Sequence, residues 1–312
     1  MGLALIWKPQ GLQSQECLSH FKKNFLSFEK KSGKSQIGHS GTLDPFAEGW
    51  LLVGWEEGSK LLAPLMGLPK TYIVNMQFGQ CSDTLDLSGK IEFASEAGLL
   101  QIRKNFESWE SDSGAFLSKY LKSHLGKGKQ VPPKFSALHV DGKRAYDLAR
   151  AGVEFELKER EIDILDAGHL CVDSQKLQWT FKVTVSSGTY IRSFARDWGE
   201  ELCAFPALLN SLTRTAIGPF QSKSTVDQLQ KSNKEDLVVE NLEMKDVEQL
   251  FDFATLSDIE AQRLQSFGRL NREFLQSSKP MILLNRQNGA LAWLKSDTRE
   301  IGRVFQKDPF AY

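Results

Sequence analysis

One run of the sequence, residues 36–49, restricts the backbone more than any other. It holds three glycines, one proline and several small polar residues, and such a run cannot form the interior of a regular helix or strand. The main chain of this kind of loop can approach a ligand closely, so the run predicts a shaped functional loop. The glycine patterns of phosphate-binding loops, G-x-x-x-x-G-K-[ST] and G-x-G-x-x-G, are not found.

Asp44 is the first candidate for chemistry in this loop. Pro45 follows it and biases its backbone toward an extended conformation, which would hold the carboxylate in one direction. The alternative is that Asp44 only caps a turn, as an Asp before a Pro often does.

A second cluster, residues 186–192, joins an alternating strand to an amphipathic helix. Arg192 near the helix start opposes the helix dipole, so a specific anionic partner is expected. Asp44 as that partner would be kept ionised and oriented, whereas the alternative is an ordinary surface ion pair. Tyr72 and Tyr190 each sit beside polar residues and fit either a core position or a stacking platform for a base.

Hydrophobic periodicity gives the fold class. Apolar residues alternate over 72–78 and 177–185, which predicts two half-buried strands. Helical spacing follows Ser14, a candidate N-cap, and recurs over 191–202. Because strands and helices alternate without a βαβ rhythm, we predict an α+β domain with a large mixed or antiparallel sheet.

The C-terminal part predicts a small β-rich module. Two apolar runs, 281–284 and 290–294, flank Asn288-Gly289, a strong signal for a β-hairpin.

The formal net charge of zero, from 39 basic and 39 acidic residues, hides a segregation along the chain. Residues 119–150 carry eight basic and two acidic groups, residues 227–260 three and ten, and residues 261–312 nine and four. Because charges act over a Debye length of about 10 Å, a neutral chain can still present a basic face to a polyanion. The alternative is that these runs are merely solvated surface.

Metal, disulfide and membrane chemistry are not indicated. The four cysteines lie far apart without a C-x-x-C pair, which suits reduced thiols in a cytoplasmic protein. No signal peptide is expected, and no apolar run approaches the roughly 18–20 residues of a membrane span.

The run Gly38 to Gly49 closely resembles the catalytic motif of the TruB family, bacterial tRNA pseudouridine synthases that act on uridine 55 of the T-loop. Further matches follow in the family's order across residues 7–220. They are Lys8-Pro9-Gln10-Gly11, Lys70-Thr71-Tyr72, Asp83-Thr84-Leu85-Asp86, Val131-Pro132-Pro133-Lys134-Phe135-Ser136-Ala137, Gly142-Lys143-Arg144-Ala145-Tyr146, Gly188-Thr189-Tyr190-Ile191-Arg192 and Leu212-Thr213-Arg214.

The resemblance implies a catalytic pseudouridine synthase domain over residues 1–226, with a basic RNA-binding flap at 119–150. An acidic connector at 227–250 and a small PUA-like RNA-binding domain at 251–312 would follow it. The reaction needs no cofactor and no metal, and the partner would be the T-arm of tRNA. We expect a cytoplasmic monomer with no obligate protein partner.

The resemblance also implies roles for single residues. Asp44 would be the catalytic nucleophile or base, Arg192 would pair with it, and Tyr72 would stack on the flipped uridine. Further substrate contacts are implied for His39, Asp86, Tyr190, Leu212, Lys134 and Lys143.

The chain departs from the family pattern at Cys81-Ser82, where Arg-Thr is usual, at Phe135, where Tyr is frequent, and in a short insertion at 27–35. Three rival functions remain open: an RNA-binding or RNA-folding protein of the same fold for which modification is incidental, a guide-RNA-dependent synthase within a multi-protein particle, and an aspartate-dependent hydrolase. The intact Asp44, Tyr72 and Arg192, the basic flap and the lack of an obvious second catalytic carboxylate favour the stand-alone isomerase.

Overall fold

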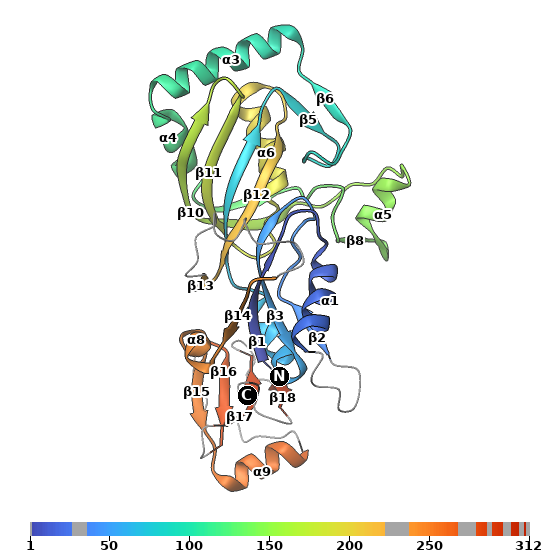
Figure 1. Cartoon of the computed structure of the whole chain (residues 1–312), viewed down its shortest axis with the longest axis vertical. Coiled ribbons are helices and arrows are strands. Elements are labelled where there is room, and N and C mark those ends of the chain that lie inside the picture. Colours follow the sequence, from blue (N-terminus) through green and yellow to red (C-terminus); the bar gives the residue numbers. More distant parts are fainter. Residues whose placement is uncertain are drawn as a thin grey trace. The chain divides into compact units, whose positions relative to one another are not determined.

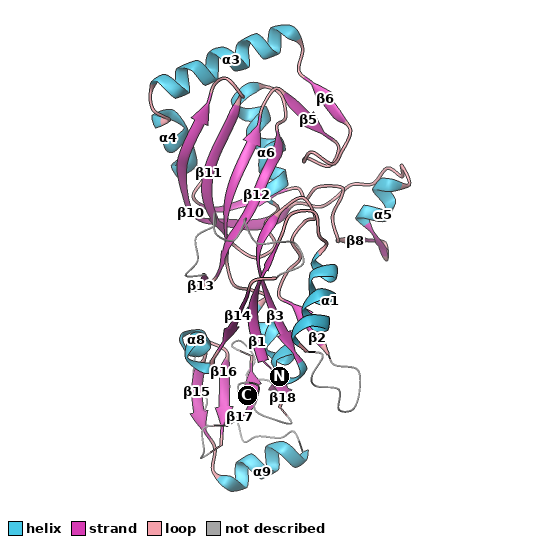
Figure 2. Ribbon diagram, in the orientation of Figure 1, coloured by secondary structure: helices cyan, strands magenta, loops and turns pink. Residues whose placement is uncertain are grey.

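The computed structural model describes residues 2–26, 36–221, 237–267, 279–285, 289–295, 301–305 and 309 (Figure 1). Helices and strands are interleaved along the chain, as the sequence predicts for the α+β class (Figure 2). The chain forms two compact units. The first contains Met1–Pro45, Gly49–Gly67 and Pro219–Tyr312, and the second contains Phe46–Glu48 and Leu68–Gly218.

The first unit is organised around β1 (Gly2–Lys8), a strand buried along its whole length. β1 pairs antiparallel with β14 (Val239–Leu242) and with β3 (Glu48–Trp55), which also pairs with β2 (Ile37–His39). The Trp7 and Trp50 rings meet edge to face at 5.3 Å between centroids. This packing joins β1 to β3, the buried strand that follows the loop carrying Asp44.

Helix α1 (Ser14–Phe25) confirms the helical spacing and corrects its start. The N-cap is Gln13, whose main-chain N–H donates to Glu16 Oε2 at 2.8 Å, so Ser14 is the first helical residue rather than the cap. Phe21 packs on Trp55 at 5.3 Å between ring centroids and joins the helix to β3. The predicted insertion at 27–35 lies outside the described residues.

The C-terminal strands form the small β-rich sheet that the sequence predicts. β15 (Asp252–Thr255) runs parallel to β16 (Met281–Leu284), whereas β16 with β17 (Ala290–Leu294) and β17 with β18 (Ile301–Val304) are antiparallel. The β16–β17 pairing confirms the hairpin, although residues 286–288 of its turn are outside the described part of the chain.

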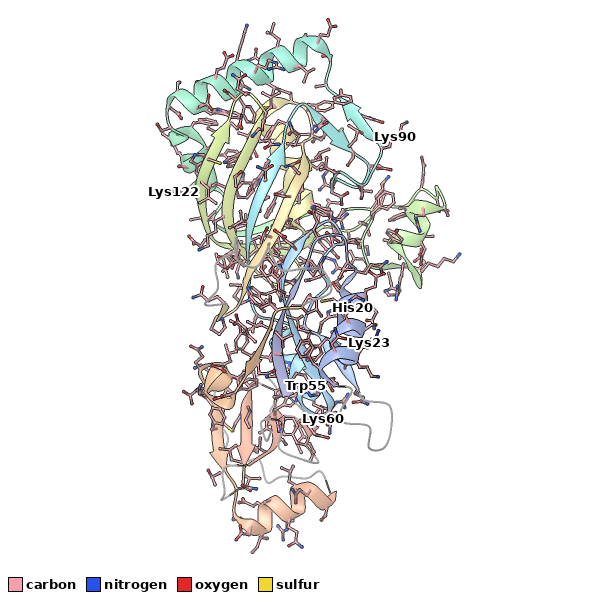
Figure 3. The ribbon with its side chains drawn as sticks, in the orientation of Figure 1. His20, Lys23, Trp55, Lys60, Lys90 and Lys122 are labelled. Atoms are coloured by element: carbon pink, nitrogen blue, oxygen red, sulfur yellow. The ribbon has the colours of Figure 1, made fainter. Side chains whose placement is uncertain are left out.

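A separate apolar cluster supports this sheet, with Leu264 of α9 (Asp258–Phe267) packed among buried residues that include Leu283 and Leu294. Lys60 (Figure 3), in the short helical segment η1 (Glu56–Leu61), makes two hydrogen bonds to this sheet. Its Nζ donates to the carbonyl of Val304, and its carbonyl accepts from Trp293 Nε1.

Only part of the predicted acidic connector is described, since residues 227–236 are not. The described part, 237–250, includes β14, α8 (Met244–Val247) and η2 (Glu248–Leu250). Nothing in the described residues tests the predicted domain limits at 226 and 250, which stay predictions.

The second unit is built on an antiparallel sheet with the strand order β12-β4-β11-β10-β7. Every neighbouring pair along this path runs in opposite directions, and the register shifts locally between β12 and β4 and between β10 and β11. The strands are β12 (Leu208–Ile217), β4 (Lys70–Gln77), β11 (Gln178–Val185), β10 (Arg160–Asp173) and β7 (Gly126–Gln130). The alternating runs of the sequence are β4 and β11, which confirms both predicted strands.

Helix α6 (Ile191–Cys203) covers one face of this sheet, as predicted from its amphipathic spacing (Figure 1). Trp198 of α6 packs on Phe181 at 5.4 Å and on Trp179 at 6.1 Å between ring centroids. These aromatic contacts fix the helix against β11 and thereby fix the position of Arg192 in its first turn.

The remaining elements are helices, two hairpins and one short strand outside the strands described so far. They are η1 (Glu56–Leu61), α2 (Leu62–Leu65), the hairpin of β5 (Gln80–Ser82) with β6 (Ile91–Phe93), α3 (Glu96–Ser111), α4 (Ala115–Ser123), the hairpin of β8 (His139–Val140) with β9 (Lys143–Arg144), α5 (Ala145–Arg150) and β13 (Phe220–Gln221).

Candidate active site

Asp44 lies in the loop between β2 and β3, as the glycine and proline pattern predicts. The loop leaves β2 through Ser40, whose N–H donates to the carbonyl of Leu52 at 2.9 Å. His39 Nδ1 accepts the N–H of Gly41 at 3.2 Å, and Gly41 has a φ of +144°, a conformation that favours glycine. The side chain of Asp44 is half-buried.

The residue before Asp44 is tied to helix α1. Ser14 Oγ donates to the carbonyl of Leu43 and accepts the N–H of the same residue, each at 3.0 Å. Both main-chain groups of Leu43 are therefore satisfied by one buried hydroxyl. The sequence pattern indicates only a helix cap at Ser14 and does not reveal this anchoring role.

The residue after Asp44 is held by the segment that follows β1. The carbonyl of Pro45 accepts the N–H of Gly11 at 2.7 Å and Lys8 Nζ at 3.4 Å. Lys8 is fully buried, and its ammonium also donates to the carbonyls of Leu12 at 2.8 Å and Pro9 at 3.1 Å. Gly11 has a φ of +90°, which explains the glycine. The Lys8-Pro9-Gln10-Gly11 run thus holds the loop at Pro45, the residue that follows Asp44.

Tyr72 and Leu212 belong to the second unit and share one face of its sheet. Tyr72 of β4 stands opposite Val183 of β11 and Arg214 of β12, and Leu212 stands opposite Val74. Residues two apart on a strand point to the same face, so Tyr72 and Val74 place Leu212 beside the tyrosine. Both side chains are buried, at 8% and 5% exposure.

Two buried cations lie on the same face of this sheet. Lys70, two residues before Tyr72, is 6% exposed, and Arg214 is 2% exposed. Burial lowers the pKa of Lys70 to about 8, and the charge of Arg214 acts in the same direction. Lys70 Nζ donates to the carbonyl of Leu68 at 2.7 Å and to Ser187 Oγ at 3.3 Å. Both cations therefore belong to the packed interior of this unit rather than to its exposed surface.

Arg192 lies in the first turn of α6 and is 6% exposed. Its Nη1 donates to the carbonyl of Thr84 at 3.0 Å and its Nη2 to the carbonyl of Phe135 at 2.9 Å. The guanidinium therefore joins three segments of the second unit. Its pairing with Asp44, which belongs to the first unit, stays a prediction.

Asp86 organises the loop that presents Thr84 to Arg192. Its Oδ1 accepts hydrogen bonds from Thr84 Oγ1 at 2.8 Å, from the Ser88 N–H at 2.8 Å and from Ser88 Oγ. Leu85 between Thr84 and Asp86 has a φ of +64°, so the loop holds an unusual backbone. The predicted contact of Asp86 with the substrate base stays a prediction.

The other predicted site residues are divided between the units. His39, half-buried at the end of β2, belongs to the first unit. Tyr190, half-buried, is the N-cap residue of α6 in the second unit. Lys134 and Lys143 are exposed in the predicted flap, where the Phe135 and Tyr146 rings pack at 6.0 Å and the Arg150 guanidinium lies 5.2 Å from the Tyr146 ring.

Ser82, at one of the departures from the family pattern, takes part in the Asp86 loop. Its Oγ donates to the Asp86 carbonyl at 2.6 Å. Its neighbour Cys81 has a pKa raised by burial and by the nearby charge of Glu92, which favours the neutral thiol.

Within the described ranges, no group of three or more His, Cys, Asp or Glu side chains is placed to hold a metal ion. Among the helices of that same part of the chain, none has both the length and the apolar character needed to cross a bilayer.

Comparison with known proteins places the chain in a family. Residues 29–191 match the TruB family pseudouridylate synthase N-terminal domain. The chain is 34% identical over 225 residues to tRNA pseudouridine synthase B of Oceanobacillus iheyensis, covering 72% of this chain and 68% of that protein. It is 36% identical over 264 residues to the protein of the same name from Rickettsia bellii, covering 83% and 82%. The chain belongs to the TruB family of pseudouridylate synthases.

Solved structures agree on the fold. A Cbf5-Nop10-Gar1 complex contains a chain that superposes with a TM-score of 0.58 at 18% identity, covering 97% of this chain and 83% of that one. A chain of an H/ACA RNP bound to a substrate RNA containing 2'-deoxyuridine superposes with a TM-score of 0.57 at 17% identity, covering 99% and 85%.

Proposed function

We propose that the protein is a tRNA pseudouridine synthase that converts uridine 55 of the T-loop to pseudouridine. The observation that carries this proposal is Asp44, which stands in the loop that resembles the family's catalytic motif, between two residues whose main chains are anchored. An anchored backbone limits the directions in which the carboxylate can point, and a fixed catalytic group lowers the entropic part of a barrier.

The reaction is an isomerisation, so its atoms balance within the substrate. The N1–C1′ bond breaks, the base turns, a C5–C1′ bond forms, and the proton on C5 moves to a nitrogen of the base. No electron acceptor and no group donor is required. Asp44 serves as nucleophile or base; attack at C1′, addition to the ring and removal of a sugar proton all use this same carboxylate.

The second unit supplies the other groups in this proposal. Arg192 keeps Asp44 ionised and oriented, and Tyr72 stacks on the base after it leaves the T-loop. Tyr190, Leu212 and Asp86 shape the base pocket.

Binding of the tRNA outside the pocket is assigned to the flap. Lys127, Lys129, Lys134, Lys143 and Arg144 are all exposed and would contact phosphates. His39 would hold the opened T-loop, and the C-terminal PUA-like sheet would bind RNA as a second contact.

We further propose a cytoplasmic monomer that works without a guide RNA or an obligate protein partner. The support is the difference in similarity, because curated relatives named tRNA pseudouridine synthase B are 34% to 37% identical and the chains from Cbf5 complexes are 16% to 18% identical. An accompanying role in tRNA folding would use the basic flap that binds the tRNA.

The test is incubation of the purified protein with an unmodified tRNA transcript, without cofactor or guide RNA, followed by pseudouridine mapping. We expect one product at uridine 55 and none in a transcript that has cytidine at position 55. Light scattering on the same sample should give the monomer mass. Product at another position would overturn the substrate assignment, and a requirement for a guide RNA would overturn the stand-alone mode.

A further inference from the structure

Strand β7, the first strand of the flap, faces helix α6 with two glycines and one long side chain, that of Gln130. Side chains on a strand alternate between faces, so Gly126, Gly128 and Gln130 share one face. That face borders a cavity of about 300 Å³ whose lining includes Phe194 and Trp198 of α6. A Cβ on Gly126 would meet no atom within 4 Å, and one on Gly128 would meet only Ile162 Cγ1 at 3.9 Å. The two glycines therefore leave open space between β7 and the helix.

Gln130 ends this strand and does reach the start of α6. It is 3% exposed, and its Oε1 accepts the N–H of Tyr190 at 2.9 Å. Tyr190 is the N-cap residue of α6, where main-chain N–H groups lack partners within the helix. The flap thus supplies an acceptor to the helix entrance.

Further hydrogen bonds fasten the residues that follow Gln130. The carbonyl of Val131 accepts Ser193 Oγ at 2.8 Å and Arg196 Nη2 at 2.9 Å. Four residues later, the carbonyl of Phe135 accepts Arg192 Nη2 at 2.9 Å. The base of the flap and the first turns of α6 are consequently one hydrogen-bonded unit that includes Arg192.

We propose that Gln130 is a positioning residue for Arg192. It fixes β7 to the N-terminus of α6, so that the base of the flap and the guanidinium of Arg192 are held in register. The catalytic part of this inference rests on the proposed function, whereas the attachment of the flap does not.

Of the two polar atoms of the Gln130 amide, only the oxygen makes a hydrogen bond among the described residues. Oε1 must be the atom that faces the Tyr190 N–H, because only the oxygen can accept, and Nε2 is buried without a hydrogen-bond partner among the described residues. Acceptance of the Tyr190 N–H is therefore the function of this side chain. Gln130→Glu keeps that acceptor and places its charge at the favourable end of the α6 dipole, whereas Gln130→Met keeps the length but removes the acceptor.

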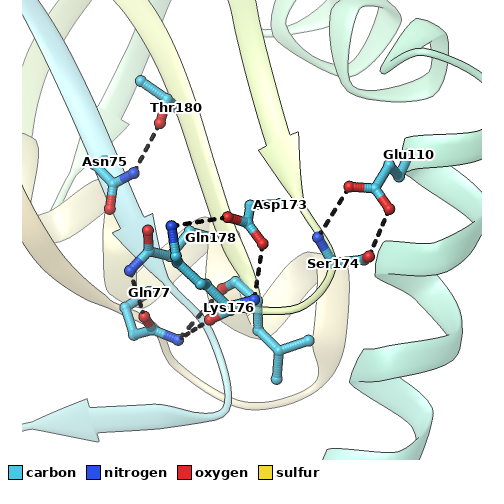
Figure 4. A network of polar contacts seen from close by, with 9 residues as sticks. Asn75, Gln77, Glu110, Asp173, Ser174, Lys176, Gln178 and Thr180 are labelled. Atoms are coloured by element: carbon cyan, nitrogen blue, oxygen red, sulfur yellow. Dashed lines mark hydrogen bonds and ion pairs between the residues drawn. The ribbon is translucent and has the colours of Figure 1, made fainter.

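A matched control is available in the same unit. Glu110 of α3 accepts the Ser174 N–H at 3.3 Å and Ser174 Oγ at 2.5 Å (Figure 4). Ser174 lies in the turn between β10 and β11, whereas α6 follows the other end of β11. Glu110→Met also removes a side-chain acceptor from a main-chain N–H, but it leaves the flap attachment intact.

The experiment measures the free protein and the reaction separately. Tryptic cleavage after Lys127, Lys129 and Lys134 is followed by mass spectrometry in the wild type, Gln130→Met, Gln130→Glu and Glu110→Met. Loss of one hydrogen bond should raise the cleavage rate of Gln130→Met by about five-fold. Cleavage in Gln130→Glu and Glu110→Met should stay within about two-fold of the wild type.

With unmodified tRNA, kcat of Gln130→Met should fall by about ten-fold at a KM within two-fold, because a misplaced group loses rate rather than binding. Gln130→Glu should restore kcat. Unchanged cleavage in Gln130→Met, an equal loss of kcat in Gln130→Glu, or the same flap cleavage in Glu110→Met would each overturn the proposal. If the wild type forms no pseudouridine, the proposed function fails, and the tryptic cleavage still decides whether Gln130 attaches the flap.

Discussion

Ser14 Oγ and the main chain of Leu43 exchange two hydrogen bonds of 3.0 Å, across 29 positions of sequence. Together with the bonds from Gly11 and Lys8 to Pro45, they anchor the residues on both sides of Asp44. A loop of small residues would otherwise sample many conformations, and ordering it during the reaction would slow catalysis.

Ser14→Ala should weaken this anchor. The N–H and the carbonyl of Leu43 would lose a buried partner, so the free energy of unfolding should fall by about 1–3 kcal/mol. The single-turnover rate on tRNA should fall between about ten-fold and a hundred-fold, because Asp44 is no longer held. Denaturant unfolding and rapid-quench assays measure the two effects.

The control is Ser19→Ala in the same helix, where the hydroxyl donates only to the Gln15 carbonyl on an exposed face. It should leave both quantities close to those of the wild type. An equal loss of rate in the two variants would contradict the anchoring role of Ser14.

Lys70 should make stability depend on pH in the alkaline range. Its pKa is about 8 in the folded protein against an ordinary value of 10.5. Below pH 8 both states hold the proton; between about pH 8 and 10.5 only the unfolded state does, so the free energy of unfolding rises with pH there. We expect a contribution of about 2 kcal/mol, the linkage value reduced for partial solvent screening.

Urea unfolding of the wild type and Lys70→Met from about pH 7.5 to 10.5 isolates this contribution. Burial raises the pKa of Cys17 and of Cys203 to about 11, and these thiols titrate in both proteins, so their effect cancels in the difference. Parallel curves for the two proteins would show that Lys70 has an ordinary pKa.

Arg192→Lys should reduce catalysis strongly although it preserves the charge. The guanidinium donates to the Thr84 and Phe135 carbonyls at once, a fork that an ammonium group cannot reproduce. The single-turnover rate should fall by about 10- to 100-fold, the equivalent of one charge-assisted hydrogen bond. Arg103→Lys on the exposed side of α3 is the control and should keep the wild-type rate. Full activity in Arg192→Lys would contradict the claim that catalysis needs both hydrogen bonds of the guanidinium.

The flap should account for most of the salt dependence of tRNA binding. Replacement of Lys127, Lys129, Lys134, Lys143 and Arg144 by Gln should weaken affinity and flatten the plot of log K against log salt. The expected change in slope is about 0.7–0.9 for each phosphate that the variant no longer neutralises. Fluorescence titrations between about 50 and 300 mM salt, the range over which such charges are screened, measure it.

A second set of five exposed cations supplies the control with the same change in net charge: Lys90, Arg103, Lys104, Lys176 and Lys182. Their replacement should leave the slope almost unchanged. A slope that responds equally to both sets would mean that net charge, rather than the flap, attracts the tRNA.

Sequence patterns were sufficient where structure is local. The alternation over β4 and β11 and the spacing of α6 follow from period-2 and period-3.6 burial, and the Asp44 loop follows from glycine and proline chemistry. The anchors of that loop depend on residues brought together by folding. A hydroxyl in a first helical turn looks like a cap, and nothing local marks Lys8 as a buried ammonium that binds three carbonyls.

The same limit applies to the second unit. The helix dipole predicted a specific anionic partner for Arg192, whereas the two acceptors that the fold brings to it, from 108 and 57 positions away, are the main-chain carbonyls of Thr84 and Phe135. Asp86 was predicted to contact substrate, and its Oδ1 is occupied by three hydrogen bonds within its own loop, a use that no period in the sequence could indicate.

The central claim, that Asp44 carries out the isomerisation of uridine 55, is tested most directly by comparing the wild type with Asp44→Asn and Asp83→Asn. Asp83, whose Oδ1 accepts the Lys90 N–H at 2.9 Å, is the matched carboxylate. Pseudouridine at position 55 is quantified in a single turnover with excess enzyme. We predict full conversion by the wild type and Asp83→Asn, and none by Asp44→Asn although it still binds the tRNA. Conversion by Asp44→Asn at the wild-type rate would contradict the claim.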